Sequence, residues 1–159
     1  MSQTQESPGK HKALFLDLDD TVRTTTTGKP CPNKPADQKV MPGRRKKIQE
    51  FIENGYKIVA VTNQGGIGLG YMTDKQCQEC LFDIDRKLGG VFDRMYYAPA
   101  SPSAKHPLTK PNPGMLLKAK KELNIDLTKS IMVGDRDTDK GAAEKAGVPF
   151  QWAKDFFRG

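Results

Sequence analysis

The sequence has no long hydrophobic run and few cysteines, and both absences narrow the class of protein. No stretch approaches the roughly 20 apolar residues that a membrane-spanning helix needs. The first residues, Met1 to Lys12, are polar and lack the apolar segment of a signal peptide. The 3 cysteines come without a secretory context, which argues against a disulfide framework. We therefore expect a cytoplasmic protein with reduced thiols and no membrane partner.

The sequence also has too few cysteines and histidines in suitable positions to form a metal site from these residues. Cys77 and Cys80 have the spacing of half a zinc site, but they fall in a predicted helix. No second Cys/His pair completes the set, because Cys31 stands alone and the chain has only 2 histidines. We expect these thiols to pack against apolar neighbours rather than to bind metal.

Acidic residues are scarce in one segment of a basic chain. The net charge is +7, and between Arg23 and Lys47 the single acid is Asp37. A basic segment of this kind attracts phosphorylated substrates or nucleic acid, or docks an acidic protein, or is simply a solvated face. These alternatives stay open. The basic residues of the segment are Arg23, Lys29, Lys34, Lys39, Arg44, Arg45, Lys46 and Lys47.

Short apolar runs alternate with helical patterns along a chain of 159 residues, a length that fits one domain. This alternation favours a doubly wound, Rossmann-like parallel sheet of about five strands with helices on both faces. The predicted strands are 12–18, 57–62, 93–98, 130–133 and 148–152, the last at or near an edge. The predicted helices are 42–54, 73–88, 113–123 and 137–146.

The remaining segments are predicted to lack regular structure. Residues 1–11 are polar and are expected to form a disordered leader, so that the domain covers 12–159. Residues 22–41 are rich in Thr, Lys and Pro and follow neither a helical nor a strand period. We interpret them as a long flap, and long ordered loops are often functional.

Polar side chains follow several predicted strands. Asp17 and Asp19 come directly after the first strand, and Thr62, Asn63 and Gln64 end the second. Because the carboxyl ends of parallel strands meet at one edge of a sheet, these groups are expected to converge there. Two later segments bring further polar groups, Lys110 and the string Gly134-Asp135-Arg136-Asp137-Thr138-Asp139.

These residue types suit the hydrolysis of a phosphomonoester. Asp17 can attack phosphorus, and Asp19 can protonate the leaving oxygen and then activate water. Carboxylates are the ligands that Mg²⁺ prefers, and Asp17 with Asp135 offers two of them. Lys110 supplies positive charge for the phosphoryl oxygens. Asp139, one helical turn beyond Asp135, can orient Lys110 or a metal-bound water.

The same motifs resemble a known family. The chain is identified as a member of the haloacid dehalogenase-like (HAD) phosphatase superfamily, subfamily IIIA-like, on four motifs. They are Asp17-Leu18-Asp19-Asp20-Thr21, Thr62, Lys110, and Gly134-Asp135-Arg136-Asp137-Thr138-Asp139. The resemblance implies catalysis through an aspartyl-phosphate, a magnesium cofactor and a minimal or absent cap domain.

The resemblance also implies roles for individual residues. The implied catalytic residues are Asp17, Asp19, Thr62 and Lys110. The implied substrate-binding residues are Thr21, Asn63, Gln64 and Thr109, and the implied metal ligands are Asp17, Asp19, Asp135 and Asp139.

Longer strings are similar to one branch of this superfamily, which contains histidinol-phosphate and heptose-1,7-bisphosphate phosphatases and, more loosely, polynucleotide 3'-phosphatases. The small-molecule enzymes typically hold zinc in a Cys/His loop before the catalytic Lys. Here residues 98–108 contain no Cys and only His106, so no structural zinc is expected. They also favour Arg directly before that Lys, where this chain has Thr109.

We therefore expect a magnesium-dependent phosphatase that acts on a small phosphorylated metabolite of the sugar phosphate or histidinol phosphate type. A polynucleotide 3'-phosphatase is the alternative, since the chain is basic. A non-enzymatic alternative is a degenerate HAD fold that serves as a binding module. A monomer is favoured.

Overall fold

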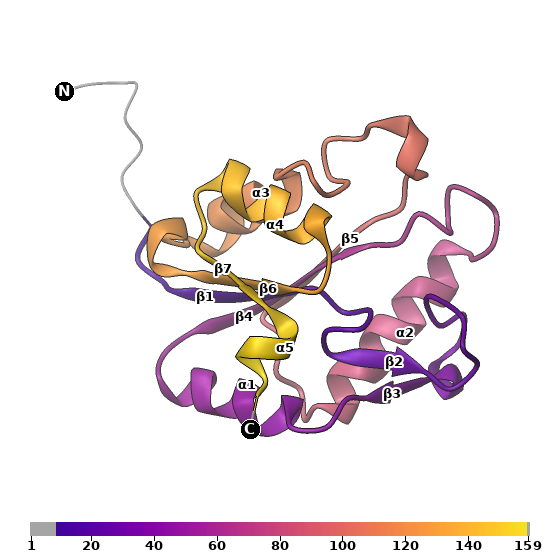
Figure 1. The fold of residues 1–159 in the computed structure, drawn as a ribbon, viewed down its shortest axis with the longest axis horizontal. Coiled ribbons are helices and arrows are strands. Elements are labelled where there is room, and N and C mark those ends of the chain that lie inside the picture. Colours follow the sequence, from indigo (N-terminus) through magenta and orange to yellow (C-terminus); the bar gives the residue numbers. More distant parts are fainter. Residues whose placement is uncertain (1–8, 159) are drawn as a thin grey trace.

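The structure, a computed structural model, describes residues 9–158. Its centre is a five-stranded sheet in the order β5-β4-β1-β6-β7, in which every neighbouring pair is parallel (Figure 1). The predicted fold class is confirmed. The strands are β1 (Ala13–Leu16), β4 (Lys57–Asn63), β5 (Arg94–Ala98), β6 (Ile131–Gly134) and β7 (Phe150–Trp152).

Helices cover both faces of the sheet (Figure 1). On one face lie α3 and α4, and on the other lie α1, α2 and α5. Local side-chain and backbone chemistry marks two helix ends: the Thr73 side chain caps α2 through a capping box, and Gly147 ends α4 at φ 77°. The helices are α1 (Arg44–Glu53), α2 (Asp74–Lys87), α3 (Gly114–Leu123), α4 (Asp137–Ala146) and α5 (Ala153–Phe156).

Strand β1 shows why the central strands read as continuous apolar runs. Leu14 and Leu16 pack into the core on the α1, α2 and α5 side. Ala13 and Phe15 pack into the core on the α3 and α4 side. All four side chains are completely buried, as a strand covered by helices on both faces requires.

The segment predicted as an irregular flap contains a small second sheet. Residues Arg23–Thr25 form β2, which pairs antiparallel with β3 (Gln38–Val40). The prediction that 22–41 lacks regular structure is therefore wrong at these two strands. Each has only three residues, and Val40 is the one apolar residue among the six, so no apolar alternation marks them. The hairpin lies beside α2, where Gln38 donates to the Cys80 carbonyl at 2.8 Å.

The C-terminal region differs from the prediction in one respect. Strand β7 lies at the sheet edge as expected, but α5 was not predicted. This helix has only four residues, too few for a helical period to show in the sequence. Its Phe156 is buried in the core on the α1 side, so the helix is held by packing.

Two other predictions concern the ends of the chain and its thiols. Most of the predicted leader, residues 1–8, lies outside the described residues. The backbone amides of Lys10 and His11 donate to the Asn124 carbonyl at 2.9 and 3.0 Å. All three cysteines are free, and both members of the Cys77-x-x-Cys80 pair are buried in the core.

No helix within residues 9–158 has the length and apolar character needed to span a bilayer.

Candidate active site

The polar groups predicted at the strand ends meet at one edge of the sheet. Strand β1 pairs with β4 on one side and with β6 on the other. Asp17 follows β1, Asn63 ends β4 and Asp135 follows β6, so their side chains come from three adjacent strands. The loop before α3 adds Lys110. This is the edge at which open α/β sheets bind ligands.

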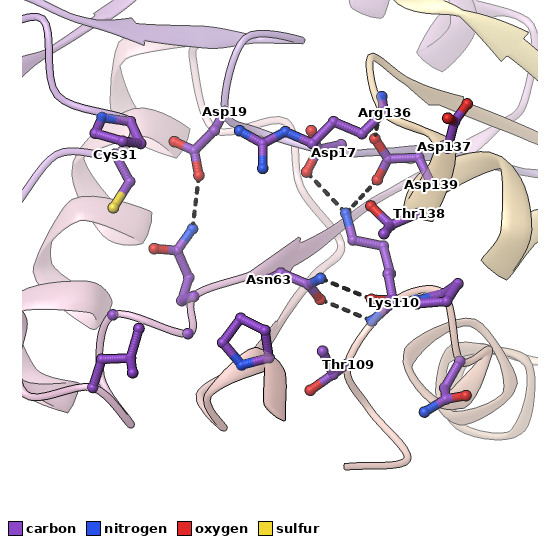
Figure 2. A pocket seen from close by; sticks show the side chains of 18 of the residues that line it. Asp17, Asp19, Cys31, Asn63, Thr109, Lys110, Arg136, Asp137, Thr138 and Asp139 are labelled. Atoms are coloured by element: carbon purple, nitrogen blue, oxygen red, sulfur yellow. Dashed lines mark hydrogen bonds and ion pairs between the residues drawn. The ribbon is translucent and has the colours of Figure 1, made fainter. Parts of the chain in front are cut away.

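Lys110 connects the end of β1 with β4 and α4, and its bonds to Asp17 and Asp139 are drawn in Figure 2. Its ammonium donates to Asp17 Oδ1 at 2.9 Å, to Asp139 Oδ1 at 2.5 Å and to the Val61 carbonyl at 2.8 Å. The side chain is 2% exposed, so it is cut off from water. Burial alone would lower the pKa of Lys110, but the carboxylates of Asp17 and Asp139 raise it above its usual range. Lys110 is therefore charged.

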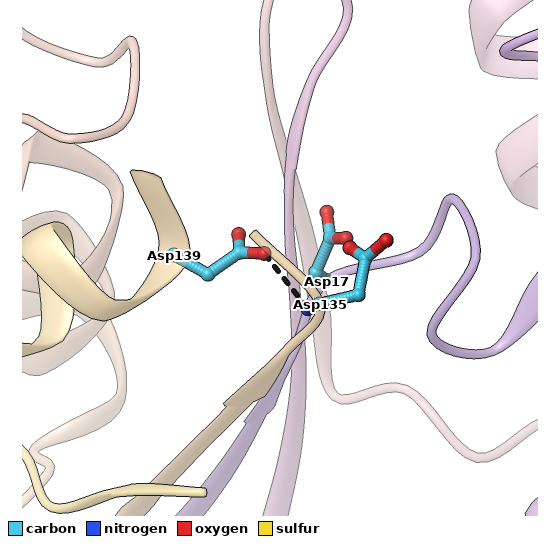
Figure 3. Close-up of side chains that lie close together, drawn as sticks. All are labelled: Asp17, Asp135 and Asp139. Carbon is cyan, nitrogen blue, oxygen red and sulfur yellow. Dashed lines mark hydrogen bonds between the residues drawn. The ribbon is translucent and has the colours of Figure 1, made fainter. Parts of the chain in front are cut away.

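Three carboxylates crowd beside that ammonium, and we call them with Lys110 the strand-end cluster: Asp17, Asp135, Asp139 and Lys110. One carboxylate oxygen from each aspartate lies within 4.8 Å of the others (Figure 3). Burial, and then the neighbouring charge of Asp17, raises the pKa of Asp135 to about 7. Three negative groups against one ammonium leave this corner of the protein short of positive charge.

The cluster suits a divalent cation. Asp135 Oδ1 is buried and has no hydrogen-bond partner. Both oxygens of Asp139 are engaged, since Oδ1 accepts from Lys110 and Oδ2 accepts from the backbone amides of Asp135 and Arg136, each at 3.1 Å. Asp17 Oδ1 likewise accepts from Lys110, and its Oδ2 accepts from Thr21 at 3.3 Å, so Asp135 is the one of the three with an oxygen that has no hydrogen-bond partner. A set of carboxylate oxygens alone matches Mg²⁺.

Asp19 lies apart from the strand-end cluster, in different surroundings. Its Oδ1 accepts from Arg23 Nε at 3.0 Å, and its Oδ2 accepts from Gln64 Nε2 at 2.9 Å. Burial raises the pKa of Asp19, while Arg23 acts in the opposite direction. The structure brings together Asp17, Asp135 and Asp139 of the four predicted metal ligands, and among the described residues the Asp19 carboxylate is not part of that group.

The residues at the end of β4 hold other parts of the site. Asn63 pairs with the backbone of Lys110, donating to its carbonyl at 3.1 Å and accepting from its amide at 2.9 Å. Gln64 donates to both Asp19 and Thr62. The Thr62 hydroxyl is fully buried. Of this trio, predicted to contact the phosphate or substrate, Asn63 and Gln64 line the pocket.

The two remaining predicted substrate-binding residues are also buried. Thr21 donates to Asp17 Oδ2 at 3.3 Å, so it contacts the predicted nucleophile. Thr109 lines the pocket, and its hydroxyl oxygen has no hydrogen-bond partner. His106 lies in the same loop, where its Nδ1 accepts from the Leu108 amide at 3.1 Å and its carbonyl accepts from Asn112.

The site opens into a pocket of about 820 Å³. The sequence had not indicated four of its neighbours as site residues. Lys105 and Arg136 bring two cations to the pocket wall, and Cys31 lies on the wall formed by the flap (Figure 2). The fourth is Arg23, which the sequence had placed in a basic surface segment but which is 1% exposed and bonded to Asp19. Arg136 stands inside the fourth motif, but neither it nor the other three was predicted as a site residue, because their places in the site depend on how loops fold over the sheet edge.

Comparison with known proteins points to one family. The sequence model described as Polynucleotide kinase 3 phosphatase matches residues 12–157. A D-glycero-beta-D-manno-heptose-1,7-bisphosphate 7-phosphatase from Haemophilus ducreyi is 37% identical over 147 residues, which is 86% of this chain and 79% of that protein.

Solved structures give the same result. A HAD-like phosphatase from Mesorhizobium loti has a TM-score of 0.79 and 32% identity, covering 92% of this chain and 74% of its own. A D,D-heptose 1,7-bisphosphate phosphatase from B. bronchiseptica, complexed with magnesium and phosphate, has a TM-score of 0.79 and 27% identity. That match covers 87% of this chain and 78% of the other.

These relatives confirm three predictions made from the sequence, namely the HAD resemblance, the phosphatase class and the magnesium cofactor. The binding-module alternative, which assumed a degenerate site, is not supported, because the relatives are phosphatases and the strand-end cluster is complete. The family match covers nearly the whole described chain. The chain belongs to the polynucleotide kinase 3 phosphatase family of HAD-like phosphatases.

Proposed function

We propose that this protein is a magnesium-dependent phosphatase that hydrolyses a small phosphorylated sugar, with Asp17 as the nucleophile. The observation that supports this most is the placement of Lys110, which bonds to Asp17 and Asp139 from the loop before α3. An ammonium fixed against a buried carboxylate at a strand end provides positive charge where a phosphoryl group would meet that carboxylate.

The proposed reaction has two steps. In the first, a carboxylate oxygen of Asp17 attacks phosphorus, the bond from phosphorus to the substrate oxygen breaks, and Asp19 gives that oxygen a proton. In the second, water attacks the aspartyl-phosphate, Asp19 accepts a proton from it, and inorganic phosphate leaves with the Asp17 carboxylate restored. Lys110 balances the charge of the phosphoryl oxygens throughout.

The metal would be held by Asp17 and Asp135. Bound Mg²⁺ supplies positive charge that screens the Asp17 carboxylate from an anionic phosphate ester. Asp139 positions Lys110 and the backbone of Asp135, since its two oxygens are taken by those groups. Thr21 holds the second oxygen of Asp17 and so orients the nucleophile.

A sugar bisphosphate is the proposed substrate class. The relatives named above include heptose bisphosphate phosphatases, and the pocket of about 820 Å³ is of a size for a sugar. Lys105 and Arg136 on its wall are suited to a second phosphate. Thr109 presents a hydroxyl beside Lys110.

A nucleic acid end is the second candidate substrate, because the matching family model carries the name of a polynucleotide phosphatase and the net charge is +7. Salt separates the two candidates. Turnover of a DNA 3'-phosphate should fall steeply between low and high salt, because several backbone phosphates release counterions on binding. Turnover of a sugar bisphosphate should fall much less.

The test is a panel of phosphomonoesters with the purified protein. It contains heptose and hexose bisphosphates, histidinol phosphate and a 3'-phosphorylated oligonucleotide, each with Mg²⁺ and with excess EDTA. We expect the highest kcat/KM for a sugar bisphosphate, and loss of turnover in EDTA that returns with Mg²⁺. Full activity in EDTA, or activity on the oligonucleotide alone, would contradict the proposal.

Three further expectations accompany it. We propose a cytoplasmic monomer, which light scattering at several concentrations would test for its oligomeric state. We also propose that no structural zinc is needed, because residues 98–108 offer only His106 as a zinc ligand. One equivalent of zinc in purified, fully active protein would contradict that expectation.

A further inference from the structure

Arg23 is an unusual residue to find inside this protein. It lies at the start of β2, and it is the largest of the fully buried side chains, with 1% of its surface exposed. Arginine is rarely buried unless its charge is paired. The groups that pair with the Arg23 guanidinium should therefore indicate its role.

Its partners lie on two sides. Nε donates to Asp19 Oδ1 at 3.0 Å, and Nη1 donates to Gln38 Oε1 at 3.0 Å. Gln38 in turn donates to the Cys80 carbonyl at 2.8 Å and to Asp83 Oδ2 at 3.1 Å, both on α2. We call the residues Asp19, Arg23, Gln38 and Asp83 the hairpin network.

Each carboxylate of the hairpin network has a cationic partner, and two of these partners are basic residues of α2 outside the network. Arg23 faces Asp19, while Asp83 is paired with Arg86 at 2.6 Å and Lys87 at 3.0 Å. A guanidinium is flat and its donors have fixed directions, so two bonds from one guanidinium fix its orientation. The position of Asp19 is then set by a side chain that is itself anchored to α2.

The backbone strengthens this arrangement. The amides of Thr21, Val22 and Arg23 all donate to the Leu18 carbonyl, and the Asp20 amide donates to the Arg23 carbonyl at 2.8 Å. The loop after β1 is thus closed on itself, with Asp19 and Arg23 forming an isolated bridge. Gln64 Nε2 donates to the other oxygen of Asp19 at 2.9 Å.

We propose that Arg23 is a positioning residue for catalysis, which holds the Asp19 carboxylate for proton transfer and ties its placement to the β2–β3 hairpin and helix α2. This inference rests on the proposed function, in which Asp19 exchanges protons with the leaving oxygen and with water. Arg23 does not itself touch the substrate, since it does not line the pocket. Its effect should therefore pass entirely through Asp19.

The experiment compares Arg23→Met, Arg23→Lys and Gln38→Met with the wild type on two substrates. One is the best sugar phosphate of the panel, whose leaving alkoxide needs a proton. The other is p-nitrophenyl phosphate, whose leaving phenolate needs little proton donation. Arg158→Met is the matched control, because Arg158 forms an exposed pair with Asp155 at 2.6 Å on the surface.

We expect Arg23→Met to lower kcat/KM for the sugar phosphate about 100-fold, the usual cost of a misplaced catalytic group. The loss for p-nitrophenyl phosphate should be several times smaller. Arg23→Lys should recover part of the activity, Gln38→Met should lose less than Arg23→Met, and Arg158→Met should match the wild type. In an Asp19→Asn background, Arg23→Met should add little further loss, because the group it positions is already gone.

Each outcome decides the question. Equal losses on both substrates, or the full Arg23→Met loss in the Asp19→Asn background, would mean that Arg23 is only structural. Circular dichroism and thermal melting show whether each variant folds, and if Arg23→Met does not fold, Arg23→Lys and Gln38→Met carry the same comparison. A wild type that hydrolyses no phosphomonoester overturns the proposed function, whereas an active wild type with a fully active Arg23→Met overturns this inference alone.

Discussion

The two aspartates of the first motif, Asp17 and Asp19, lie two residues apart but belong to regions that differ in charge balance. Asp17 belongs to the strand-end cluster, where three carboxylates lie together and one lysine pairs with two of them. Asp19 belongs to the hairpin network, where each carboxylate has a cationic partner. One region is left short of positive charge, and the other is balanced.

This difference indicates what each region does. A cluster short of positive charge is costly unless a cation binds, so it favours a divalent metal at the place where the phosphate must approach. A balanced buried network needs no ligand and holds its members in place. The same short motif thus contributes one residue to a binding region and one to a positioning region. Substitutions in the two regions should have different effects.

The largest effect is expected at the nucleophile. Asp17→Asn removes the attacking oxygen, so turnover should fall by about 10⁴-fold or more. The fold should survive, because the amide keeps the size of the side chain and removes one negative charge from a crowded cluster. Phosphate release and thermal melting measure the two effects, with the surface substitution Asp155→Asn as the control. Retained turnover would remove Asp17 as the nucleophile.

The next effect is expected at the lysine of the strand-end cluster. Lys110→Met leaves Asp17 and Asp139 without their buried cation, which should destabilise the protein by about 3–5 kcal/mol as well as abolish activity. Urea unfolding measures the change. The double variant Lys110→Met/Asp139→Asn should regain part of the stability, since one stranded charge is gone. Loss of an exposed cation, as in Arg158→Met, should lower the free energy of unfolding by at most a few tenths of the decrease expected for Lys110→Met.

A smaller effect is expected at Asp135, where loss of the negative charge should stabilise the metal-free protein rather than destabilise it. Its folded pKa of about 7 lies above the ordinary value of 3.8, so between these values the folded state binds the proton and the unfolded state does not. Stability of the metal-free protein should therefore fall as pH rises from about 4 to 7. Because Asp135 is partly exposed, its contribution is about 1–2 kcal/mol at most.

Asp135→Asn provides the test. In EDTA at pH 8 the variant should melt at a higher temperature than the wild type, because the like charge beside Asp17 is gone. It should also lose the rise in melting temperature that Mg²⁺ gives the wild type. If the variant melts lower in EDTA, or still responds fully to Mg²⁺, Asp135 is not the metal-facing carboxylate that we propose.

The smallest effect is expected on the pocket wall. Lys105→Met and Arg136→Met should each raise KM for a sugar bisphosphate about tenfold, because each removes a cation that would contact the second phosphate. KM for the matching monophosphate should change little, and kcat should hold for both. Equal changes for the two substrates would show that these cations do not read the second phosphate.

Much of this arrangement followed from local patterns. The buried strands were predicted because a parallel strand covered on both faces must be apolar throughout, as β1 is. Asp17 and Lys110 were predicted to lie in one site, because polar groups at the ends of parallel strands meet at one edge of the sheet. The hairpin strands β2 and β3 were missed, since three-residue polar strands carry no period.

Arg23 shows the limit of sequence reasoning most clearly. By itself, a Lys- and Arg-rich segment predicts a charged surface, and burial of one of its members depends on partners that are distant along the chain. Gln38 and Asp83 supply those partners only because the hairpin packs beside α2. Neither the spacing nor the composition of 23–47 carries that information.

The sequence by itself determined the layered fold, the order of its elements and the four motifs at the strand ends, because each of these depends on short-range apolar period and turn chemistry. Only the tertiary structure decided which role each carboxylate has. Whether Asp139 serves Lys110 or a metal, and whether Asp19 meets a cation, depends on loops far apart in sequence and on the low dielectric that surrounds them once they pack together.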